Sequence, residues 1–231
     1  MLFRDEDEDV ELLPFANRAE AGRMLGAKLA AAYSGQGDVV VLGLPRGGVP
    51  VAFQVAQVLN APLDVLVVRK LGIPWERELA MGAIASGEVQ VLDLSSVKQL
   101  CVPNEDIQDV VAVERNELAR QERLYRGNRP PLAVAGKTVI LVDDGIATGS
   151  CILAAITAVR RQGAALIVVA VPVGPATACN AIRMEADEVI SVAEPETFLA
   201  ISQWYEDFSQ TSDDEVCALL EKQSSSAPRA A

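Results

Sequence analysis

The chain has 231 residues, of which 50% are hydrophobic and 23% charged, and its formal net charge is −12. This composition favours a folded domain with an apolar core, and the negative charge argues against non-specific binding to nucleic acid or to anionic membranes. The absence of histidine excludes a histidine general base and a histidine-ligated metal. Four separated cysteines without a CxxC pair predict thiols in a reducing cytoplasm. Because no apolar run approaches ~18 residues and the chain opens with acids, we expect neither a membrane span nor a signal peptide.

The N-terminal part is predicted to be an acidic segment followed by a helix. Residues 1–16 contain a run of acids that we interpret as solvated and mobile. Asn17 can cap a helix that extends to about Tyr33, because apolar residues recur on one helical face and glycines follow. This helix precedes the first strand of the expected domain.

A strand, a glycine-containing loop and a helix come next. Residues 39–42 form an apolar run typical of a buried strand, and a helix is expected over about 51–59. Between them, Gly47 and Gly48 expose backbone amides, and Arg46 offers a planar fork suited to phosphate oxygens. The alternative interpretation is a tight turn with an exposed arginine.

The next predicted strand, 63–68, ends in two adjacent cations, Arg69 and Lys70. Ligands of parallel α/β sheets bind beyond the carboxyl ends of the strands. We therefore expect both side chains to face a polyanionic group at that edge. A solvated basic turn is the alternative.

Residues 74–131 depart from the alternation of strands and helices. We expect a hairpin of 78–86 and 89–94, and then a long helix over about 104–125 that is capped by Asn104. Arginines and glutamates alternate along this helix, which favours a solvated, salt-bridged surface. The alternative is an arm that offers arginines to a polyphosphate. The arginines concerned are Arg115, Arg123 and Arg126.

The most informative stretch is a buried strand, 139–142, followed by two acids and a loop that leads into a helix at about 151–159. Backbone N–H groups and the helix dipole make such a helix start an anion site, and glycines let a ligand approach the backbone. Because no lysine follows the last glycine, the loop is not a Walker A motif. The loop residues are Gly145, Ile146, Ala147, Thr148, Gly149 and Ser150.

The two acids, Asp143 and Asp144, indicate what the anion is attached to. Carboxylates beside a phosphate site can accept hydrogen bonds from neighbouring hydroxyls. A phosphate with vicinal hydroxyls next to it describes a ribose 5-phosphate. The alternative is an acidic strand end followed by an ordinary helix start.

The remaining sequence continues the same alternation. The expected elements are strands at 166–171 and 188–192 and helices that end near 184 and cover 213–223. The aromatic stretch 198–208 is expected to pack on the sheet edge or to form a lid. Residues 223–231 are predicted to be a disordered tail.

This order of elements predicts an α/β fold, with a central, mostly parallel sheet, helices on both faces, and a small hood or arm. With no repeat and no linker between two cores, we expect one domain. It covers 17–222 and carries 74–131 as a flexible arm insertion.

The stretch 142–150 resembles the signature of the type I phosphoribosyltransferases, which is a hydrophobic strand, two acids, a short loop and Thr-Gly. The resemblance extends over about 38–192. It implies that 5-phosphoribosyl-1-pyrophosphate with Mg²⁺ is the substrate, that a nitrogen acceptor such as a nucleobase displaces pyrophosphate, and that the protein is a cytoplasmic homodimer.

The resemblance also implies roles for the candidate residues. The loop 145–150 would hold the 5-phosphate, while Asp143 and Asp144 would hold the ribose hydroxyls, support positive charge at C1 and reach Mg²⁺ through water. Pyrophosphate would be held by Arg46, Gly47, Gly48, Arg69 and Lys70. Because the family often places its acceptor-binding hood in terminal segments, Trp204 and Tyr205 are candidates for stacking on a base. On this basis Asp144→Asn should abolish turnover with little loss of folding.

Nothing in the chain specifies the acceptor, so two other functions stay open. One is a sensor that binds the sugar pyrophosphate or a nucleotide without transferring it. The other is a docking subunit in which the glycine loops are only structural.

Overall fold

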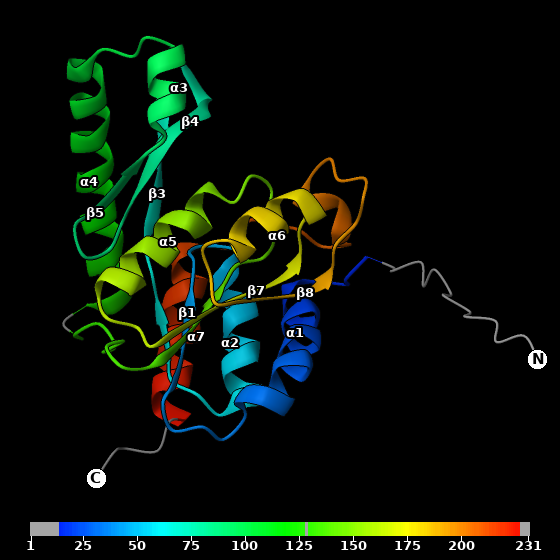
Figure 1. Cartoon of the computed structure of the whole chain (residues 1–231). Helices are drawn as coiled ribbons and strands as arrows, with labels where there is room; N and C mark the ends of the chain where they lie inside the picture. The colour runs from blue at the N-terminus through cyan, green and yellow to red at the C-terminus, as the bar shows by residue number, and fades with distance from the viewer. Residues whose placement is uncertain (1–13, 128, 227–231) are drawn as a thin grey trace, which may run out of the picture.

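The computed structural model describes residues 14–127 and 129–226, which form a core sheet flanked by helices and an arm that projects from it (Figure 1). The helices are α1 Arg18–Tyr33, α2 Gly48–Leu59, α3 Leu94–Gln99, α4 Asn104–Arg126, α5 Ser150–Arg161, α6 Ala176–Arg183 and α7 Asp213–Ser226, with a 3-10 turn at Ile201–Trp204. The strands are β1 Val39–Gly43, β2 Leu63–Val65, β3 Val68–Ile73, β4 Glu76–Ala85, β5 Val89–Leu92, β6 Thr138–Val142, β7 Leu166–Val173 and β8 Glu188–Ala193.

The core sheet is parallel, with strand order β2-β1-β6-β7-β8, and helices cover both of its faces. Successive residues of a strand point to opposite faces. Val41 packs with Leu25 of α1 on one face, and Val40 packs with Ile152 of α5 and Ile182 of α6 on the other. The predicted α/β fold is therefore confirmed. Within the described ranges, none of the helices is both long and apolar enough to cross a bilayer.

The arm consists of the antiparallel sheet β3-β4-β5 with α3 and α4 (Figure 1). It has its own apolar cluster, in which Leu71 and Met81 of the sheet pack with Ile107 and Val111 of α4. The predicted hairpin and long helix are confirmed. Toward its end, α4 returns to the core, where Tyr125 is buried in a cluster with residues of α7.

The predicted strand 63–68 is divided between the two sheets. β2 pairs with β1 in the core, whereas β3 begins at Val68 and pairs with β4 in the arm. The change occurs at two residues: Leu66 donates its N–H to the Gly43 carbonyl at 3.1 Å, and Val67 donates to the Ser86 hydroxyl at 3.2 Å. Arg69 and Lys70 therefore lie inside an arm strand, and their predicted place beyond a core strand was wrong.

Two predicted helix ends also differ. The N-cap of α4 is Pro103, whose carbonyl accepts the N–H of Ile107 at 3.1 Å, so Asn104 is the first helical residue and not the cap. α7 continues to Ser226, and Gln223 donates from its side chain to the Ala61 carbonyl at 3.0 Å. Residues 223–226 are thus helical and not part of a disordered tail.

The N-terminal segment joins the fold earlier than predicted. Phe15 is buried and forms a bridge to Tyr205, with their ring centroids 5.4 Å apart. Phe15 therefore belongs to the folded domain, which was expected to begin at residue 17. The acidic run itself, at 5–11, and the last residues, 227–231, lie outside the described residues.

Candidate functional site

The parallel pairing of β1 with β6 brings the two glycine-containing loops to the same edge of the sheet. Gly43 is the register partner of Val142, and Leu44 donates its N–H to the Val142 carbonyl at 2.9 Å. Each strand then leads through its loop into a helix, β1 into α2 and β6 into α5. The two motifs found in the sequence are therefore neighbours.

The glycines of the first loop lie directly against the two acids. A Cβ atom on Gly47 would be 2.0 Å from Asp144 Oδ2, and one on Gly48 would be 2.9 Å from Asp143 Oδ1 and 2.7 Å from the Val142 carbonyl oxygen. Any side chain here would displace a carboxylate or the backbone. The Pro45–Arg46 peptide bond in the same loop is cis. The absence of a Cβ at 47 and 48 is what allows the two loops to touch.

Asp144 is held in an ion pair that the sequence analysis missed. Arg18 Nε lies 2.8 Å from Asp144 Oδ2, and the two side chains are 11% and 12% exposed. The Arg18 guanidinium also stacks on Phe208, 4.0 Å from the ring centroid, and donates to the Ser209 carbonyl at 2.7 Å. Tyr205 donates from its hydroxyl to the Asp144 backbone carbonyl at 2.6 Å. These contacts fix Asp144 from the N-terminal and C-terminal segments.

Asp143 has a different environment. Its side chain is half-buried, and Oδ1 accepts the N–H of Asp144 at 2.9 Å. Burial and the neighbouring charge of Asp144 raise the pKa of the Asp143 carboxyl well above its usual range, with Arg18 opposing the shift. Burial also raises the pKa of Asp144, and its hydrogen bond from Arg18 counteracts this. A hydroxyl donor or a cation at Asp143 would relieve the unfavourable charge.

The second loop connects β6 to the start of α5, where the sequence predicts an anion site. Ile146 is buried and donates its N–H to the Val173 carbonyl at 2.9 Å, which anchors the loop. Thr148 is exposed, and its hydroxyl lies 3.3 Å from that of Ser150, the first residue of α5. Gly149 has a φ of 79°, which favours glycine. The loop therefore presents hydroxyls and a helix start together, while its role toward phosphate stays a prediction.

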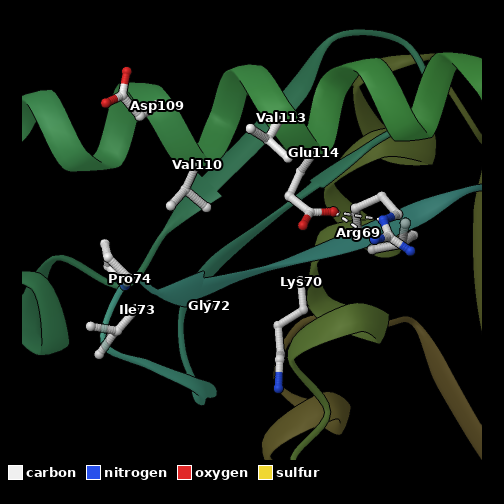
Figure 2. A pocket seen from close by; sticks show the side chains of 10 residues that line it. Arg69, Lys70, Gly72, Ile73, Pro74, Asp109, Val110, Val113 and Glu114 are labelled. Carbon is white, nitrogen blue, oxygen red and sulfur yellow. Dashed lines mark hydrogen bonds and ion pairs between the residues drawn. The ribbon is translucent and has the colours of Figure 1, made fainter.

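The three predicted cations come from two parts of the fold, because Arg69 and Lys70 lie on β3 of the arm and Arg46 lies in the first core loop. Figure 2 shows Arg69 turned toward α4, where its Nη2 lies 2.7 Å from Glu114 Oε2, and Lys70 extending from the opposite side of β3. This opposite orientation follows from the pleat of a strand. Arg46 is partly exposed, and its Nη1 lies 3.9 Å from Asp213 Oδ1 of α7.

The three arginines singled out on α4 have structural contacts. Arg126 is held by Asp64 at 3.1 Å and is 10% exposed. Arg115 donates to the Gln90 side chain at 3.2 Å, and Arg123 donates to the Ala119 carbonyl at 3.2 Å. The predicted salt-bridged surface describes this helix better than an array of phosphate-binding arginines.

A cavity of about 440 Å³ lies between β3 and α4, next to Arg69 (Figure 2). It is lined by Val68, Arg69, Lys70, Gly72, Ile73, Pro74, Asp109, Val110, Val113 and Glu114. Its walls are mainly apolar, with Arg69 and Glu114 at one end and Asp109 at the other. By contrast, Tyr205, a predicted stacking candidate, is buried in the cluster around Phe15, and Trp204 packs against the same cluster. For these two aromatics the packing interpretation is correct.

Comparisons with known proteins agree with this arrangement. A model of the phosphoribosyl transferase domain matches residues 16–209. A Mycobacterium tuberculosis protein, provisionally named a phosphoribosyl transferase, is 48% identical over 211 residues, which cover 90% of this chain and 46% of that protein. The chain thus spans about half the length of the curated relatives it matches.

A solved structure is similar over nearly its whole length. The crystal structure of TT1426 from Thermus thermophilus matches with a TM-score of 0.78 and 38% sequence identity, covering 91% of this chain and 99% of that one. The domain model includes both glycine loops and both acids. On these grounds, the chain belongs to the phosphoribosyl transferase domain family.

Proposed function

We propose that this protein transfers the 5-phosphoribosyl group from 5-phosphoribosyl-1-pyrophosphate to a nitrogen acceptor, in the class of nucleobases, and releases pyrophosphate. One observation carries the proposal. Asp143 is followed in the chain by the loop that leads through Thr148 into α5, and a Cβ atom on Gly48 of the other loop would lie 2.9 Å from its carboxylate. A sugar with phosphate groups at both ends requires donors on two sides and a hydroxyl acceptor between them.

The ion pair between Arg18 and Asp144 leads us to assign different roles to the two acids. Asp143 is the acid that we assign to the ribose hydroxyls. Asp144 is held by Arg18 at 2.8 Å and contacts the Gly47 position, so we assign it to fixing both loops. The 5-phosphate is assigned to the amides of 145–149 with the Thr148 hydroxyl. A ligand at Asp143 stabilises its charged form, because each hydroxyl donates to a carboxylate that has lost water.

In the reaction, the bond between C1 and the pyrophosphate oxygen breaks and its electron pair leaves with pyrophosphate. Positive charge builds on the sugar ring, and the Asp143 carboxylate favours that state electrostatically. The acceptor nitrogen forms the new bond to C1, and its proton passes to water. Arg46, together with Arg69 and Lys70 on β3, is assigned to the leaving group.

The acid pair fits the chemistry of Mg²⁺, which prefers hard oxygen ligands and retains much of its water. No group of three or more histidine, cysteine or acidic side chains suited to a metal occurs within residues 14–127 and 129–226. We therefore assign Asp143 to contact Mg²⁺ through water. When bound, the ion neutralises part of the charge that develops on pyrophosphate.

The acceptor is assigned to the cavity between β3 and α4. Its apolar walls, formed by Ile73, Pro74 and Val110, suit the faces of a planar ring, and Arg69 at one end is also assigned to the leaving group. A binding site of this kind orients a ring by a few polar contacts at one end.

The decisive experiment measures pyrophosphate release with 5-phosphoribosyl-1-pyrophosphate, Mg²⁺ and a panel of nucleobases. We expect release with at least one base and none without a base. Asp143→Asn is the matched inactive control. Tight binding of the sugar pyrophosphate by calorimetry without release across the panel would favour the sensor, and absence of binding would refute both.

We also propose that the working form is a cytoplasmic homodimer. The arm exposes large apolar side chains, since Trp75, Leu94 and Val113 are 59%, 71% and 65% exposed. Such residues are typical of contacts between protein surfaces. Sedimentation velocity tests the stoichiometry, and a monomer at micromolar concentration would refute it.

A further inference from the structure

Asp213, the first residue of α7, joins three segments that are distant in sequence. Its Oδ1 accepts a hydrogen bond from the Tyr125 hydroxyl of α4 at 2.7 Å and lies 3.9 Å from Arg46 Nη1 of the first glycine loop. Its Oδ2 lies 3.7 Å from Arg120 Nη2, also on α4. One carboxylate is therefore placed between two guanidinium groups, one from the core and one from the arm.

The two arginine contacts are long and exposed. Charge-assisted hydrogen bonds between these groups have lengths of about 2.7–2.9 Å, which is shorter than the 3.9 Å and 3.7 Å found here. The side chains of Arg46, Arg120 and Asp213 are 36%, 50% and 29% exposed. Arg120 has a firmer bidentate partner in Glu117, with both N–O distances at 2.8 Å. Exposed ion pairs of this kind contribute little to stability, so they can exchange partners.

The location of Arg46 and Arg120 indicates which anion replaces Asp213. Arg46 belongs to the same loop as Gly48, whose Cβ position would lie 2.9 Å from Asp143 Oδ1, so an anion held by Arg46 shares a loop with the proposed sugar site. Arg46 is already assigned to the leaving group there. Pyrophosphate carries more negative charge than one carboxylate and has oxygens on two phosphorus atoms, which suits two arginine forks from opposite sides.

We propose that the Asp213 carboxylate occupies a pyrophosphate subsite between Arg46 and Arg120, and that the pyrophosphate end of the substrate displaces it. This inference rests on the proposed function and adds Arg120 as a binding residue that the sequence analysis did not identify. Since Arg120 belongs to α4 and Arg46 to the core, the bound pyrophosphate links the arm to the sheet.

The test compares Asp213→Asn with Asp214→Asn. Asn keeps the shape of Asp213 and an acceptor oxygen for Tyr125, but removes the competing charge. Asp214 is the exposed next residue in the same first helical turn, so its variant changes the protein charge equally. Titration calorimetry with magnesium pyrophosphate should show about three- to ten-fold tighter binding for Asp213→Asn. Asp214→Asn should bind like the wild type.

Two arginine variants complete the design. Arg120→Gln should weaken pyrophosphate binding by about three- to ten-fold. Arg123→Gln should not, because Arg123 is exposed on the same helix and bonds to the helix's own Ala119 carbonyl. Tyr125→Phe reports the effect of losing the tyrosine contact alone. Thermal melts of every variant show whether the fold is intact.

The outcomes separate this inference from the proposed function. A wild-type protein that binds pyrophosphate and the sugar pyrophosphate, with Asp213→Asn no tighter than Asp214→Asn, would overturn the inference and leave the function standing. A wild-type protein that binds neither compound would overturn both. Tighter binding by Asp213→Asn, which misfolding cannot produce, together with weaker binding by Arg120→Gln, would support it.

Discussion

Neutralising the two acids one at a time should affect stability in different ways. Asp144→Asn keeps the side-chain shape but leaves Arg18 without a carboxylate in a place where the two side chains are 11% and 12% exposed. Removing one partner of a buried ion pair costs about 3–5 kcal/mol. Here Arg18 keeps its contacts with the Ser209 carbonyl and the Phe208 ring, and the variant no longer buries a charged carboxylate at position 144. We therefore expect the free energy of unfolding to fall by about 1–3 kcal/mol. For a chain of this length the Tm falls by about 2–12 °C.

Asp143→Asn should leave the free energy of unfolding unchanged or increase it at neutral pH. Burial and the Asp144 charge raise the pKa of Asp143 in the folded state above its usual value of 3.8. Because the folded state binds the Asp143 proton more tightly than the unfolded state, the protonated side chain contributes its full stability at pH values below the unfolded-state pKa. That contribution is lost as the pH rises through the folded-state pKa. The Tm of Asp143→Asn relative to the wild type should therefore increase from about pH 4 to about pH 7.

The assay is calorimetric unfolding of the wild type and both variants over this pH range, with binding of 5-phosphoribosyl-1-pyrophosphate measured in the same buffers. Asp143→Asn should lose binding while keeping its Tm, and this variant replaces Asp144→Asn as the clean test of turnover. Equal losses of Tm in the two variants, or wild-type affinity in Asp143→Asn, would refute the division of roles between the acids.

Three further results are expected. Gly47→Ala should lower the free energy of unfolding by about 1–3 kcal/mol in urea denaturation, because its Cβ would meet the Asp144 carboxylate; Gly37→Ala, where no atom lies within 4 Å, should change it little. Cys101, which is exposed, should react with iodoacetamide well before Cys151, whose pKa burial raises to about 11, and peptide mass spectrometry at several pH values should show the Cys151 rate rising toward that pH. Arg126→Met should lower the Tm, since it removes the cation from Asp64 and leaves that buried carboxylate with two backbone N–H donors, at a cost of about 1–3 kcal/mol, and an unchanged melt would contradict this.

The sequence was sufficient to predict those strands and loops whose local pattern agrees with the topology of a parallel sheet. Apolar runs followed by glycine loops and helices predict parallel strands, and parallel strands place their loops at one edge. The loops at 46–48 and 143–149 were identified in this way, and the structure brings them into contact. The strand switch at 66–67 could not be found, because residues 65–68 form an unbroken apolar run with no breaker. Only pairing with Gly43 and Ser86 distinguishes the two strands.

Arg18 was missed because its partner is 126 residues away in the sequence. One signal was available. Arg18 is the first residue of α1, where the helix dipole disfavours positive charge. A cation that breaks a local preference at a helix start points to a compensating partner elsewhere in the fold. Asp213 and Arg120 gave no such signal, since charges at those positions suit an exposed helix.

In the proposed function, the paired cations explain how a chain with a net charge of −12 would hold pyrophosphate. Arg18 is paired with Asp144, Arg69 with Glu114, and Arg46 lies near Asp213, so each of these cations has a carboxylate of the same chain as a partner. In the proposed function, pyrophosphate would replace Asp213 at Arg46 and Glu114 at Arg69. It must therefore attract each guanidinium group more strongly than a single carboxylate does. A monoanion gains little from such an exchange, whereas pyrophosphate gains at two arginines together. We therefore expect the acidic chain to select for ligand charge, because only a concentrated negative charge would displace its own acids.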